Sequence, residues 1–510
     1  MVNITRPPAQ KVERGQDPRT GRVTCTVAVT PPDGVEAALG AASAASRTVG
    51  ASSPATRARW LRAIADALEE PDAAAGLIAL ADRETALGET RLAAELARTA
   101  DQLRFYGDAA VEGSYLGVTI DRATPARPSL ARVRVPLGPV AVFGASNFPL
   151  AFGVLGNDTA SALAAGCPVV VKGHPAHPAL SARLADLALS ALERAGAPDG
   201  AFALVTGFDS GAILVRSPRT AAVAFTGSQQ GGQHLWRLAN ERDVVIPVFA
   251  EMGTVNPVVL TPAGAADTTE VAAGFVRAFT GGAGQFCTKP GLLFAPSGSG
   301  FAAAAGRALE RSAPQAWSLT EQIAASAAAG TDGLVEDGAT VVARVAGPGR
   351  GWSVEAVLLS APIGAVRPGN RLLEECFGPV ALVVEYQDMA ELLSVLPRLQ
   401  GTLAAAIMSG GEQDPDLPRL LDALTPLAGR VVVDGWPTGV ATAWGQQHGG
   451  PWPATTAPAS TSVGAAALDR FTRPVTYQGA PDTALPPPLR PDNPWSVPRR
   501  VDGALETGRR

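Results

Sequence analysis

Apolar and polar positions follow a helical period near the start of the chain and alternate shortly after it. Alanine, leucine, arginine and glutamate recur with helical spacing over residues 34–112, which predicts three or four amphipathic helices. In residues 115–122 and 131–136 apolar and polar positions alternate instead. Two strands around a proline-containing turn are therefore expected there.

Between residues 138 and 262 short apolar runs alternate with helical patterns. Strands are predicted over 139–143, 168–171, 201–205, 220–225 and 243–249, and helices over 150–165, 177–195 and 228–241. Short apolar strands between helices are typical of a parallel sheet that is covered on both faces. Such a sheet binds ligands at the carboxyl ends of its strands.

A second α/β region is expected from about residue 256 to residue 430. The chain after residue 435 is rich in glycine, proline, threonine and tryptophan, and it contains a strand-like stretch at 472–478. Residues 481–510 are rich in proline and arginine, and we expect them to wrap a surface or to be loose. No internal repeat is visible in the sequence.

Composition indicates a globular protein and excludes several classes of partner. A chain of 510 residues is too long for one simple core, so two or three subdomains are expected. The net charge of −5 gives no electrostatic footprint for nucleic acid or for an acidic membrane. No apolar run is long enough to span a bilayer, and the N-terminus lacks the apolar core of a signal peptide. We therefore expect a cytoplasmic protein.

The cysteines and histidines predict neither a disulfide framework nor a metal site. The four cysteines are Cys25, Cys167, Cys287 and Cys376. They lie far apart and form no CxxC pair, which argues against both disulfides and a cysteine-rich zinc site. His174 and His177 are three residues apart, but prolines interrupt any helix that would align them. No metal is expected.

Cys287 has the local sequence of a nucleophile. It follows a run of glycines in the segment 279–290, and glycine lets a backbone come close to a ligand. Lys289 lies two positions on, and a nearby cation favours thiolate over thiol. The alternative is a small buried residue in a helix, which fits Cys167 better than Cys287.

Three polar residues come directly after predicted strands. Asn147 could donate a hydrogen bond to a developing oxyanion, or it could cap a helix. Lys172 suits a ribose hydroxyl or a phosphate at a strand end, and the alternative is a solvated lysine. Glu251 could act as a general base in the same crevice, whereas a surface glutamate is the alternative.

Two further segments contain candidate cofactor-binding residues. A Gly-Ser turn at Gly227 and Ser228 opens a helix that contains Gly232, and backbone N–H groups at a helix N-terminus bind pyrophosphate. The turn does not match the GxGxxG fingerprint. In the segment 374–380, Glu375 could hold ribose hydroxyls and Phe377 could pack on a planar ring.

The order of these segments resembles the aldehyde dehydrogenase superfamily over roughly residues 30–480. The most specific parts are the glycine-rich cysteine segment, Glu-Met-Gly at 251–253 and Glu-Cys-Phe-Gly-Pro at 375–379. Gly-His-Pro-Ala-His-Pro, Gly-Gln-Phe-Cys-Thr-Lys-Pro, Gly-Trp-Pro-Thr-Gly and His-Gly-Gly-Pro resemble one branch of it. That branch holds 2-ketoglutarate semialdehyde (2,5-dioxovalerate) dehydrogenases and NADP-dependent fatty aldehyde dehydrogenases.

The resemblance implies an α/β fold with a Rossmann-like cofactor domain, an α/β catalytic domain and a β-strand oligomerisation arm. The expected cofactor domain comprises residues 1–115 and 138–252, rejoined by part of 435–460. The expected catalytic domain comprises residues 253–434. The expected arm comprises 116–137 and 461–480, and 481–510 is a C-terminal tail. A strand edge offered to a partner fits a homodimer or a homotetramer.

The resemblance also assigns chemical roles. Cys287 would attack the aldehyde and form a thiohemiacetal and then a thioester, Asn147 would hold the oxyanion with the Cys287 amide, and Glu251 would activate water. The cofactor would be held at Lys172, Gly227, Ser228, Gly232, Glu375 and Phe377. Candidate linings of the aldehyde pocket are Phe148, Phe286, Thr288 and Trp444.

The sequence narrows the choice of cofactor and substrate without fixing either one. Many NAD-preferring members have a glutamate where this chain has Pro175, so we expect NADP to be accepted, paired with Lys172, with NAD also possible. The expected substrate is 2-ketoglutarate semialdehyde, whose carboxylate requires an arginine that the sequence does not identify. A medium- or long-chain aliphatic aldehyde is the alternative and would need an apolar tunnel. A coenzyme A-acylating reductase and a non-catalytic binding homologue are less consistent with Glu251, Cys287 and Asn147.

Overall fold

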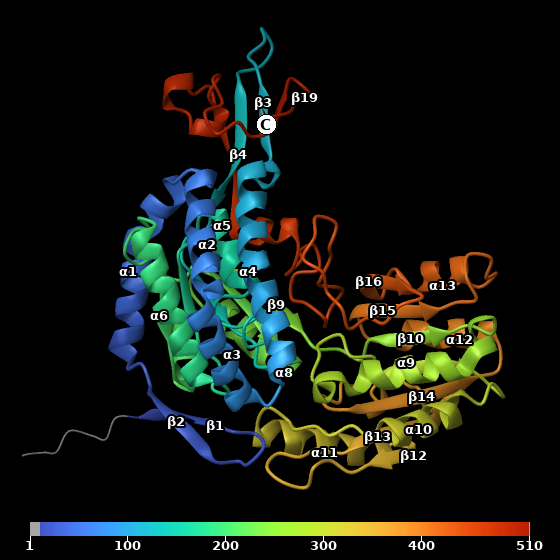
Figure 1. Cartoon of the computed structure of the whole chain (residues 1–510). Helices are drawn as coiled ribbons and strands as arrows, with labels where there is room; N and C mark the ends of the chain where they lie inside the picture. Colours follow the sequence, from blue (N-terminus) through green and yellow to red (C-terminus); the bar gives the residue numbers. More distant parts are fainter. Residues whose placement is uncertain (1–10, 509–510) are drawn as a thin grey trace, which may run out of the picture.

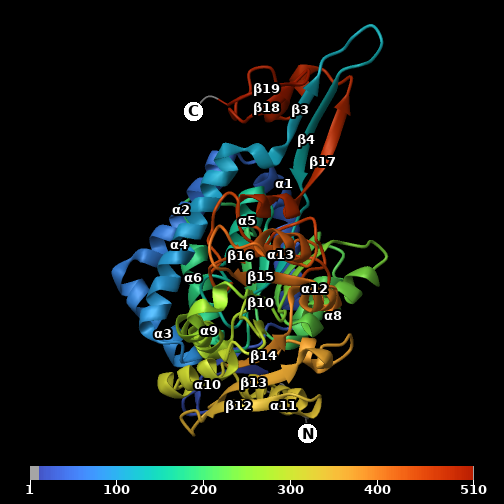
Figure 2. The same cartoon turned by 90° about the vertical axis from the view of Figure 1, so that its right-hand side faces the viewer.

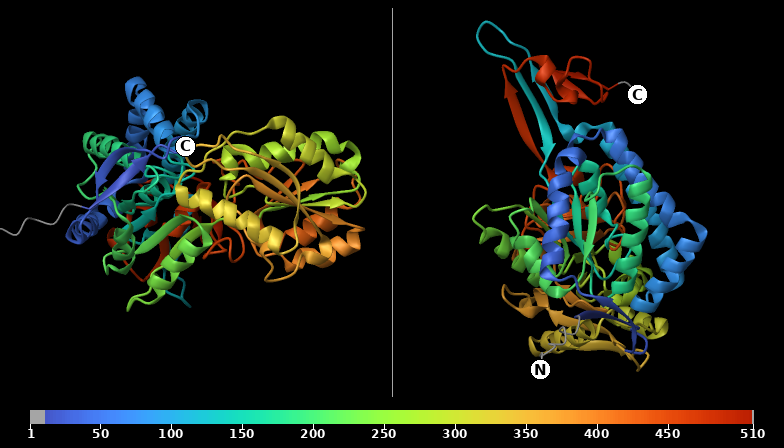
Figure 3. Two further views of the ribbon diagram at one scale, coloured as in Figure 1. Left: turned by 90° about the horizontal axis from the view of Figure 1, so that it is seen from below. Right: turned by 90° about the vertical axis from the view of Figure 1, so that its left-hand side faces the viewer.

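The computed structural model describes residues 11–508. Two α/β units lie beside each other, and a narrow β-arm projects from the first of them (Figure 1). The view from below shows the segments that connect the two units, which cross on the side where the units face each other (Figure 3). No helix within the described residues is both long enough and apolar enough to cross a membrane.

The first unit is built on a five-stranded parallel sheet with the order β7-β6-β5-β8-β9. Its strands are β5 (Val140–Phe143), β6 (Val169–Lys172), β7 (Phe202–Val205), β8 (Ala222–Gly227) and β9 (Val248–Met252). Successive side chains of a strand point to opposite faces of the sheet. On β6, Val169 and Val171 therefore pack into one apolar core and Val170 into the other.

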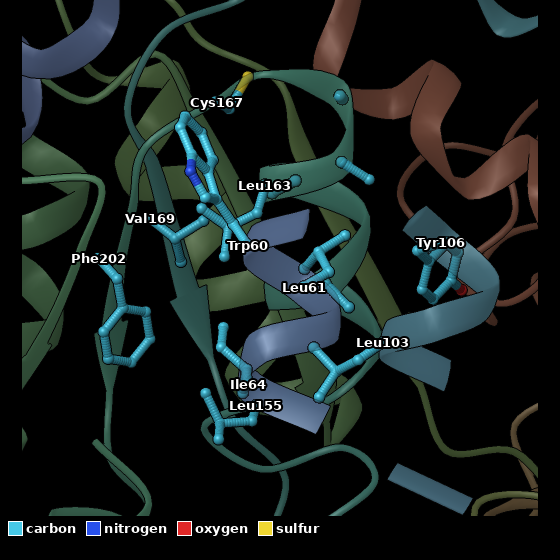
Figure 4. Packing of buried hydrophobic residues seen from close by; sticks show 14 of the residues in the cluster. Trp60, Leu61, Ile64, Leu103, Tyr106, Leu155, Leu163, Cys167, Val169 and Phe202 are labelled. Atoms are coloured by element: carbon cyan, nitrogen blue, oxygen red, sulfur yellow. The ribbon is translucent and has the colours of Figure 1, made fainter. Parts of the chain in front are cut away.

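Helices cover both faces of this sheet. They are α1 (Pro32–Ala51), α2 (Pro54–Glu69), α3 (Pro71–Thr85), α4 (Glu89–Glu112), α5 (Asn157–Ala165), α6 (Pro178–Arg194), α7 (Phe208–Arg216) and α8 (Gln229–Asn240). Four helices within the first 112 residues confirm the helical pattern seen in the sequence. Figure 4 shows the larger core, where Trp60 and Leu61 of α2 face Leu163 of α5 and Val169 of β6.

Two predicted elements are wrong in part. The helix expected over 150–165 begins only at Asn157, because the preceding residues form tight turns in which a Cβ at Gly153 would lie 1.9 Å from the Pro149 carbonyl oxygen. The strand expected over 243–249 is shifted to β9, whose bounds are Val248–Met252. Val244 and Val245 are exposed instead. The shift places Glu251 inside the last strand.

The second unit is a seven-stranded sheet with the order β12-β13-β14-β11-β10-β15-β16. Its strands are β10 (Pro257–Leu260), β11 (Leu292–Pro296), β12 (Thr340–Val345), β13 (Ala356–Pro362), β14 (Val380–Tyr386), β15 (Thr402–Met408) and β16 (Ala428–Val433). The helices are α9 (Thr268–Thr280), α10 (Phe301–Ser312), α11 (Glu321–Glu336), α12 (Met389–Val395) and α13 (Leu417–Leu424). Only the edge strand β12 runs antiparallel to its neighbour among the described strands of this sheet.

The arm is a five-stranded sheet with the order β17-β4-β3-β18-β19 (Figure 2). Its strands are β3 (Val118–Asp121), β4 (Leu130–Pro136), β17 (Thr472–Gln478), β18 (Arg499–Val501) and β19 (Ala504–Glu506). Of the two expectations for residues 481–510, a tail that wraps a surface agrees with the structure and a loose tail does not, because β18 pairs in parallel with β3. Leu489 and Val497 are buried and anchor the tail.

The N-terminal hairpin belongs to neither large sheet. β1 (Val12–Gln16) and β2 (Val23–Ala28) pair only with each other and lie at the foot of the first unit (Figure 1). The Thr206 hydroxyl, just after β7, donates to the Ala28 carbonyl oxygen at 2.7 Å. The hairpin is thereby held at the carboxyl edge of the first sheet.

Candidate active site

Cys287 lies in a loop whose backbone requires glycine. Between α9 and the thiol, Gly282 has φ 58° and Gly284 has φ 66°. A Cβ at Gly284 would lie 2.1 Å from the carbonyl oxygen of Gly378, so no larger residue fits there without displacing the 374–380 segment. The glycine run therefore brings the thiol loop against the segment that carries Glu375. Cys287 itself is partly exposed.

A histidine that sequence reasoning did not assign to the site adjoins the thiol. The Nε2 atom of His448 lies 3.8 Å from Cys287 Sγ and 3.4 Å from Glu251 Oε2. Both His448 and Glu251 are almost completely buried. Neither carboxylate oxygen of Glu251 has a hydrogen-bond partner within the described residues. The three side chains form a compact group with an available carboxylate.

The protonation states of this group follow from its burial. Burial raises the pKa of Cys287 well above its ordinary value, and the negative charges of Glu251 and Glu375 raise it further. The resting group is therefore a thiol, and a base is needed to activate it. Burial also raises the pKa of Glu375 to about 8, while the Lys289 ammonium acts to lower it and the Glu251 charge to raise it.

Asn147 lies in the loop after β5 and not at a helix end, since α5 begins ten residues later at Asn157. Its side-chain Nδ2 donates to the Gln285 carbonyl oxygen at 2.7 Å, two residues before Cys287. Arg91 donates to the Asn147 carbonyl oxygen at 2.7 Å and fixes the loop from the other side. A donor amide is thus held at the thiol loop.

Lys289 does not pair with the thiol. Its Nζ donates to the carbonyl oxygens of Cys376 and Val380, both at 2.7 Å, and the side chain is buried. The sequence suggested a cation that favours the thiolate. In the structure the ammonium instead bridges the carbonyl groups of Cys376 and Val380, in the segment that follows Glu375.

The residues expected at the cofactor lie along the carboxyl edge of the first sheet. Lys172 ends β6 and is buried, and burial lowers the pKa of its ammonium. Ser228 caps α8 by accepting from the Gly231 N–H at 3.2 Å. A Cβ at Gly227 would lie 2.6 Å from the Phe225 ring, and one at Gly232 the same distance from Met252 Sδ. Glycine at these two positions allows the turn and the start of α8 to pack against Phe225 and Met252.

Glu375 and Phe377 approach this edge from the second unit. The Glu375 carboxylate rests on Gly253, immediately after β9, where a Cβ would lie 2.2 Å from Oε2. Glu375 Oε1 is buried without a partner within the described residues. Phe377, two residues on, is partly buried. A ribose hydroxyl donor would satisfy this carboxylate, so the residues present fit a dinucleotide.

Two of the four expected pocket linings, Phe148 and Phe286, are stacked beside an arginine. The rings of Phe148 and Phe286 stack with centroids 5.4 Å apart, and the Arg91 guanidinium lies 5.0 Å from each. Thr288 is buried. Trp444 is half-exposed and meets Phe105 edge-on at 5.9 Å.

Arg98 of α4 is a second residue that sequence reasoning missed. It lines a cavity of about 480 Å³ that lies between α4 and residues 440–442. Its guanidinium lies 5.5 Å from the Phe152 ring and donates to the Val440 carbonyl oxygen at 2.9 Å. Burial lowers the pKa of Arg98, while the charges of Glu95 and of the Cys287 thiolate act to raise it. The guanidinium is thus within electrostatic reach of the thiol.

The histidine pair considered as a metal site is bound to protein groups. His177 lies with Nε2 3.2 Å from the Ala145 carbonyl oxygen and Nδ1 3.3 Å from the Ser181 hydroxyl. Burial lowers the pKa of His177 to about 4. Its ring is therefore neutral near pH 7, with both nitrogens engaged.

The chain resembles known proteins in both sequence and fold. A model of the aldehyde dehydrogenase family matches residues 6–457. The chain is 44% identical over 467 residues to alpha-ketoglutaric semialdehyde dehydrogenase 2 of Azospirillum brasilense, which covers 89% of this chain and 88% of that protein. It is 40% identical over 437 residues to alpha-ketoglutaric semialdehyde dehydrogenase of Acinetobacter baylyi, covering 84% and 83%. The crystal structure of PnpE in complex with nicotinamide adenine dinucleotide superposes with a TM-score of 0.79 at 22% identity, over 92% of this chain and 94% of that one.

Proposed function

Because the chain belongs to the aldehyde dehydrogenase family, we propose that it oxidises 2-ketoglutarate semialdehyde to 2-ketoglutarate with NAD or NADP. The relatives from Azospirillum and Acinetobacter carry that activity in their names. The observation that carries the proposal for this chain is Arg98, a half-buried cation that lines the cavity between α4 and residues 440–442.

Formation of the first covalent bond uses the group around the thiol. His448 Nε2 takes the proton of Cys287, and the Glu251 carboxylate at 3.4 Å stabilises the imidazolium. The sulfur bonds to the aldehyde carbon, and the carbonyl oxygen becomes an oxyanion. The Asn147 amide and the Cys287 N–H hold this oxygen, and each such preorganised donor contributes roughly 3–4 kcal/mol. Asn147 exchanges the Gln285 carbonyl for the oxyanion at this step.

The remaining steps release the acid. A nicotinamide cofactor, which Lys172 and Glu375 would hold, would supply the hydride acceptor, and loss of a hydride from the former aldehyde carbon would leave a thioester on Cys287. Glu251 then takes a proton from water, and the hydroxide adds to the thioester carbon. The carbon–sulfur bond breaks, the carboxylic acid leaves, and the Cys287 thiolate takes back its proton from the His448 imidazolium. Glu251 suits this role because it is buried with both oxygens free.

Arg98 is the cation of this region that can meet a substrate carboxylate. Arg91 and Arg98 flank Glu95 on α4, and Asp101 lines the cavity beside Arg98. One oxygen of Glu95 accepts from the amides of Leu150 and Ala151, and the other has no hydrogen-bond partner within the described residues. The charges are thus mixed, and the support for an anionic substrate is the Arg98 guanidinium itself, which can form a charge-assisted hydrogen bond to a carboxylate.

The position of Arg98 suits a short substrate. His448 adjoins the thiol, the Phe152 ring lies 6.4 Å from the His448 ring, and Arg98 lies 5.5 Å from Phe152 on the far wall. An aldehyde at Cys287 with a carboxylate three carbons further on would extend along this wall. The aromatic rings would contact the intervening methylene groups.

A panel of aldehydes tests the proposal. With the native enzyme, kcat/KM for 2-ketoglutarate semialdehyde should exceed that for hexanal and decanal. In Arg98→Met the KM for the semialdehyde should rise by about 100-fold, since a charge-assisted hydrogen bond is lost, while the values for the alkanals stay level or improve. Arg104→Met is the matched control, because Arg104 borders the same cavity but is paired with Asp66 and Glu69. A native preference for alkanals would replace the proposal with the aliphatic alternative.

The acceptor of the acyl group is tested separately. A buried carboxylate with free oxygens supports water as the acceptor, so the acid should form at the same rate with and without coenzyme A. Formation of an acyl-coenzyme A product would instead indicate an acylating reductase.

The arm supports a homo-oligomer. β17 and β19 are the edge strands of its sheet and leave backbone groups unpaired along each side. A second copy of the chain could pair with such an edge in a dimer or a tetramer. Light scattering on the purified protein distinguishes these states from a monomer.

A further inference from the structure

The adenosine end of the cofactor site contains a carboxylate from an unexpected part of the chain. In doubly wound sheets an acidic side chain at a strand end accepts a hydrogen bond from the ribose 2′-hydroxyl. The position three residues after Lys172 is the exposed Pro175, which cannot do this. We infer that Glu13 of the N-terminal hairpin takes this role and makes the enzyme prefer NAD over NADP. The inference rests on the proposed use of these cofactors.

One oxygen of the Glu13 carboxylate accepts a hydrogen bond, and the other has no donor within the described residues. Its Oε1 accepts from the Gly207 N–H at 2.9 Å, just after β7. Its Oε2 is buried and has no partner within the described residues. A buried oxygen that lacks a donor is costly, and a hydroxyl is a donor that would satisfy it.

The free oxygen belongs to a side chain held at the end of the strand next to Lys172. Lys172 of β6 is in register with Val205 of β7, and Glu13 is bonded to Gly207 just after β7. The Glu13 charge acts to raise the pKa of Lys172, against burial, which lowers it. An acceptor and a donor thus lie at the ends of adjacent strands, which matches two adjacent ribose hydroxyls.

The charges around this space disfavour a 2′-phosphate. Lys11 and Asp209 pair with each other at 3.7 Å and cancel. Burial lowers the pKa of His174 well below its ordinary value, so this ring is neutral. Glu13 then offsets Lys172, so the ammonium is less able to pair with a phosphate of charge near −2. The carboxylate would repel that phosphate at close range.

The hairpin is anchored firmly enough to define the position of Glu13. The Thr206 N–H donates to the Thr30 hydroxyl at 3.0 Å, which ties the residues after β2 to the end of β7. Gly207 has φ 99°, and a Cβ there would lie 2.5 Å from Val29 Cγ1. The close approach of Val29 to Gly207 therefore requires glycine and fixes the amide that binds Glu13.

Equilibrium binding without aldehyde tests the inference. The dissociation constants of NAD and NADP, and of the fragments 5′-AMP and 2′,5′-ADP, are measured by calorimetry. For the native protein we expect NADP to bind at least tenfold more weakly than NAD. In Glu13→Gln the oxygen that accepts from Gly207 is kept and the charge is lost. The ratio of the two constants should shift toward NADP by about tenfold, with the same shift for the fragments.

A matched control and a clear contrary result complete the test. Glu112→Gln makes the same change at an exposed carboxylate at the end of α4 and should leave both constants unaltered. Equal or tighter binding of NADP by the native protein, or an unchanged ratio in Glu13→Gln, would overturn the inference. Because the assay contains no aldehyde, its result does not depend on which aldehyde is oxidised.

Discussion

Arg57 in the helical core of the first unit and Glu251 at the junction of the two units are both almost completely buried, yet their surroundings differ. The Arg57 guanidinium donates to the carbonyl oxygens of Ala164 and Ser52 at 2.8 and 2.7 Å and to the Tyr115 hydroxyl at 2.7 Å. Both oxygens of Glu251 lack a hydrogen-bond partner within the described residues. The core satisfies its buried charge with hydrogen bonds, whereas the catalytic centre leaves a buried carboxylate without a hydrogen bond.

The difference indicates where the molecule is built for stability and where for chemistry. A satisfied buried group is costly to remove because its partners lose their bonds. An unsatisfied buried carboxylate is costly to keep, and it persists where the reaction supplies the missing donor. Substitutions in the two regions should therefore separate activity from stability.

The largest effect is expected from Cys287→Ala. The variant cannot form the thiohemiacetal, so aldehyde-dependent reduction of the cofactor should fall by at least about 10⁴-fold, to the assay background. Its thermal stability should match that of the native protein. Cys167→Ala, a thiol removed from the first core, should keep its turnover number and lose some stability instead. Undiminished oxidation by Cys287→Ala would refute the covalent mechanism.

Glu251→Gln should lower turnover by about 10²- to 10⁴-fold, because a general base is removed from the hydrolysis step. The thioester should then accumulate and be visible as a mass increase on the protein. Added hydroxylamine, which needs no general base, should release the acyl group. The urea midpoint should stay level or rise, since a buried carboxylate without a hydrogen-bond donor is replaced by a neutral group. Rapid hydrolysis without an accumulating thioester would assign the base to another residue.

Arg57→Met should produce the opposite pattern. Two carbonyl oxygens and a hydroxyl lose their donor, so we expect the unfolding free energy of the first unit to fall by about 3 kcal/mol or more. Scanning calorimetry should show a Tm lower by several degrees. The rate per folded molecule should be unchanged at low temperature. A loss of kcat without a loss of Tm would mean that the core and the centre are coupled.

The same contrast shows which residues a sequence can identify. Cys287 could be predicted because its glycine run is a local feature, and Asn147 and Glu251 because each follows an apolar strand. His448 could not, since it meets Cys287 across 161 positions of chain, and only its glycine-rich setting hinted at a special role. For Lys289 the sequence left open a bias on the thiol or a structural pairing, and the structure shows the pairing. The thiol lies two positions away in sequence, but the partners of Lys289 are carbonyl groups about ninety residues away.

Much of the fold was predictable for a comparable reason. Helical spacing over the first 112 residues and the apolar strands β5 to β8 depend on local pattern, and the structure confirms them. The turns at 150–156 depend on the close packing of Gly153 against the Pro149 carbonyl group. The spacing of apolar residues carries no information about such a contact. The partner of β3 in the C-terminal tail is likewise a long-range pairing.

The smallest effect concerns the pH dependence of stability. Burial raises the pKa of Glu375 to about 8 in the folded protein, above the roughly 4.3 of an unfolded glutamate. The folded state therefore binds the proton more tightly, and this contribution to stability is complete below about pH 4 and is lost as the pH rises toward 8. Glu375→Gln should remove the dependence, so its Tm relative to the native protein should increase by a few degrees between pH 5 and pH 9. Glu374→Gln, at the exposed neighbouring position, should show no such trend. A parallel course of the Glu375→Gln and native curves would mean that the carboxyl group is ionised near its ordinary pKa and that the Lys289 ammonium outweighs burial.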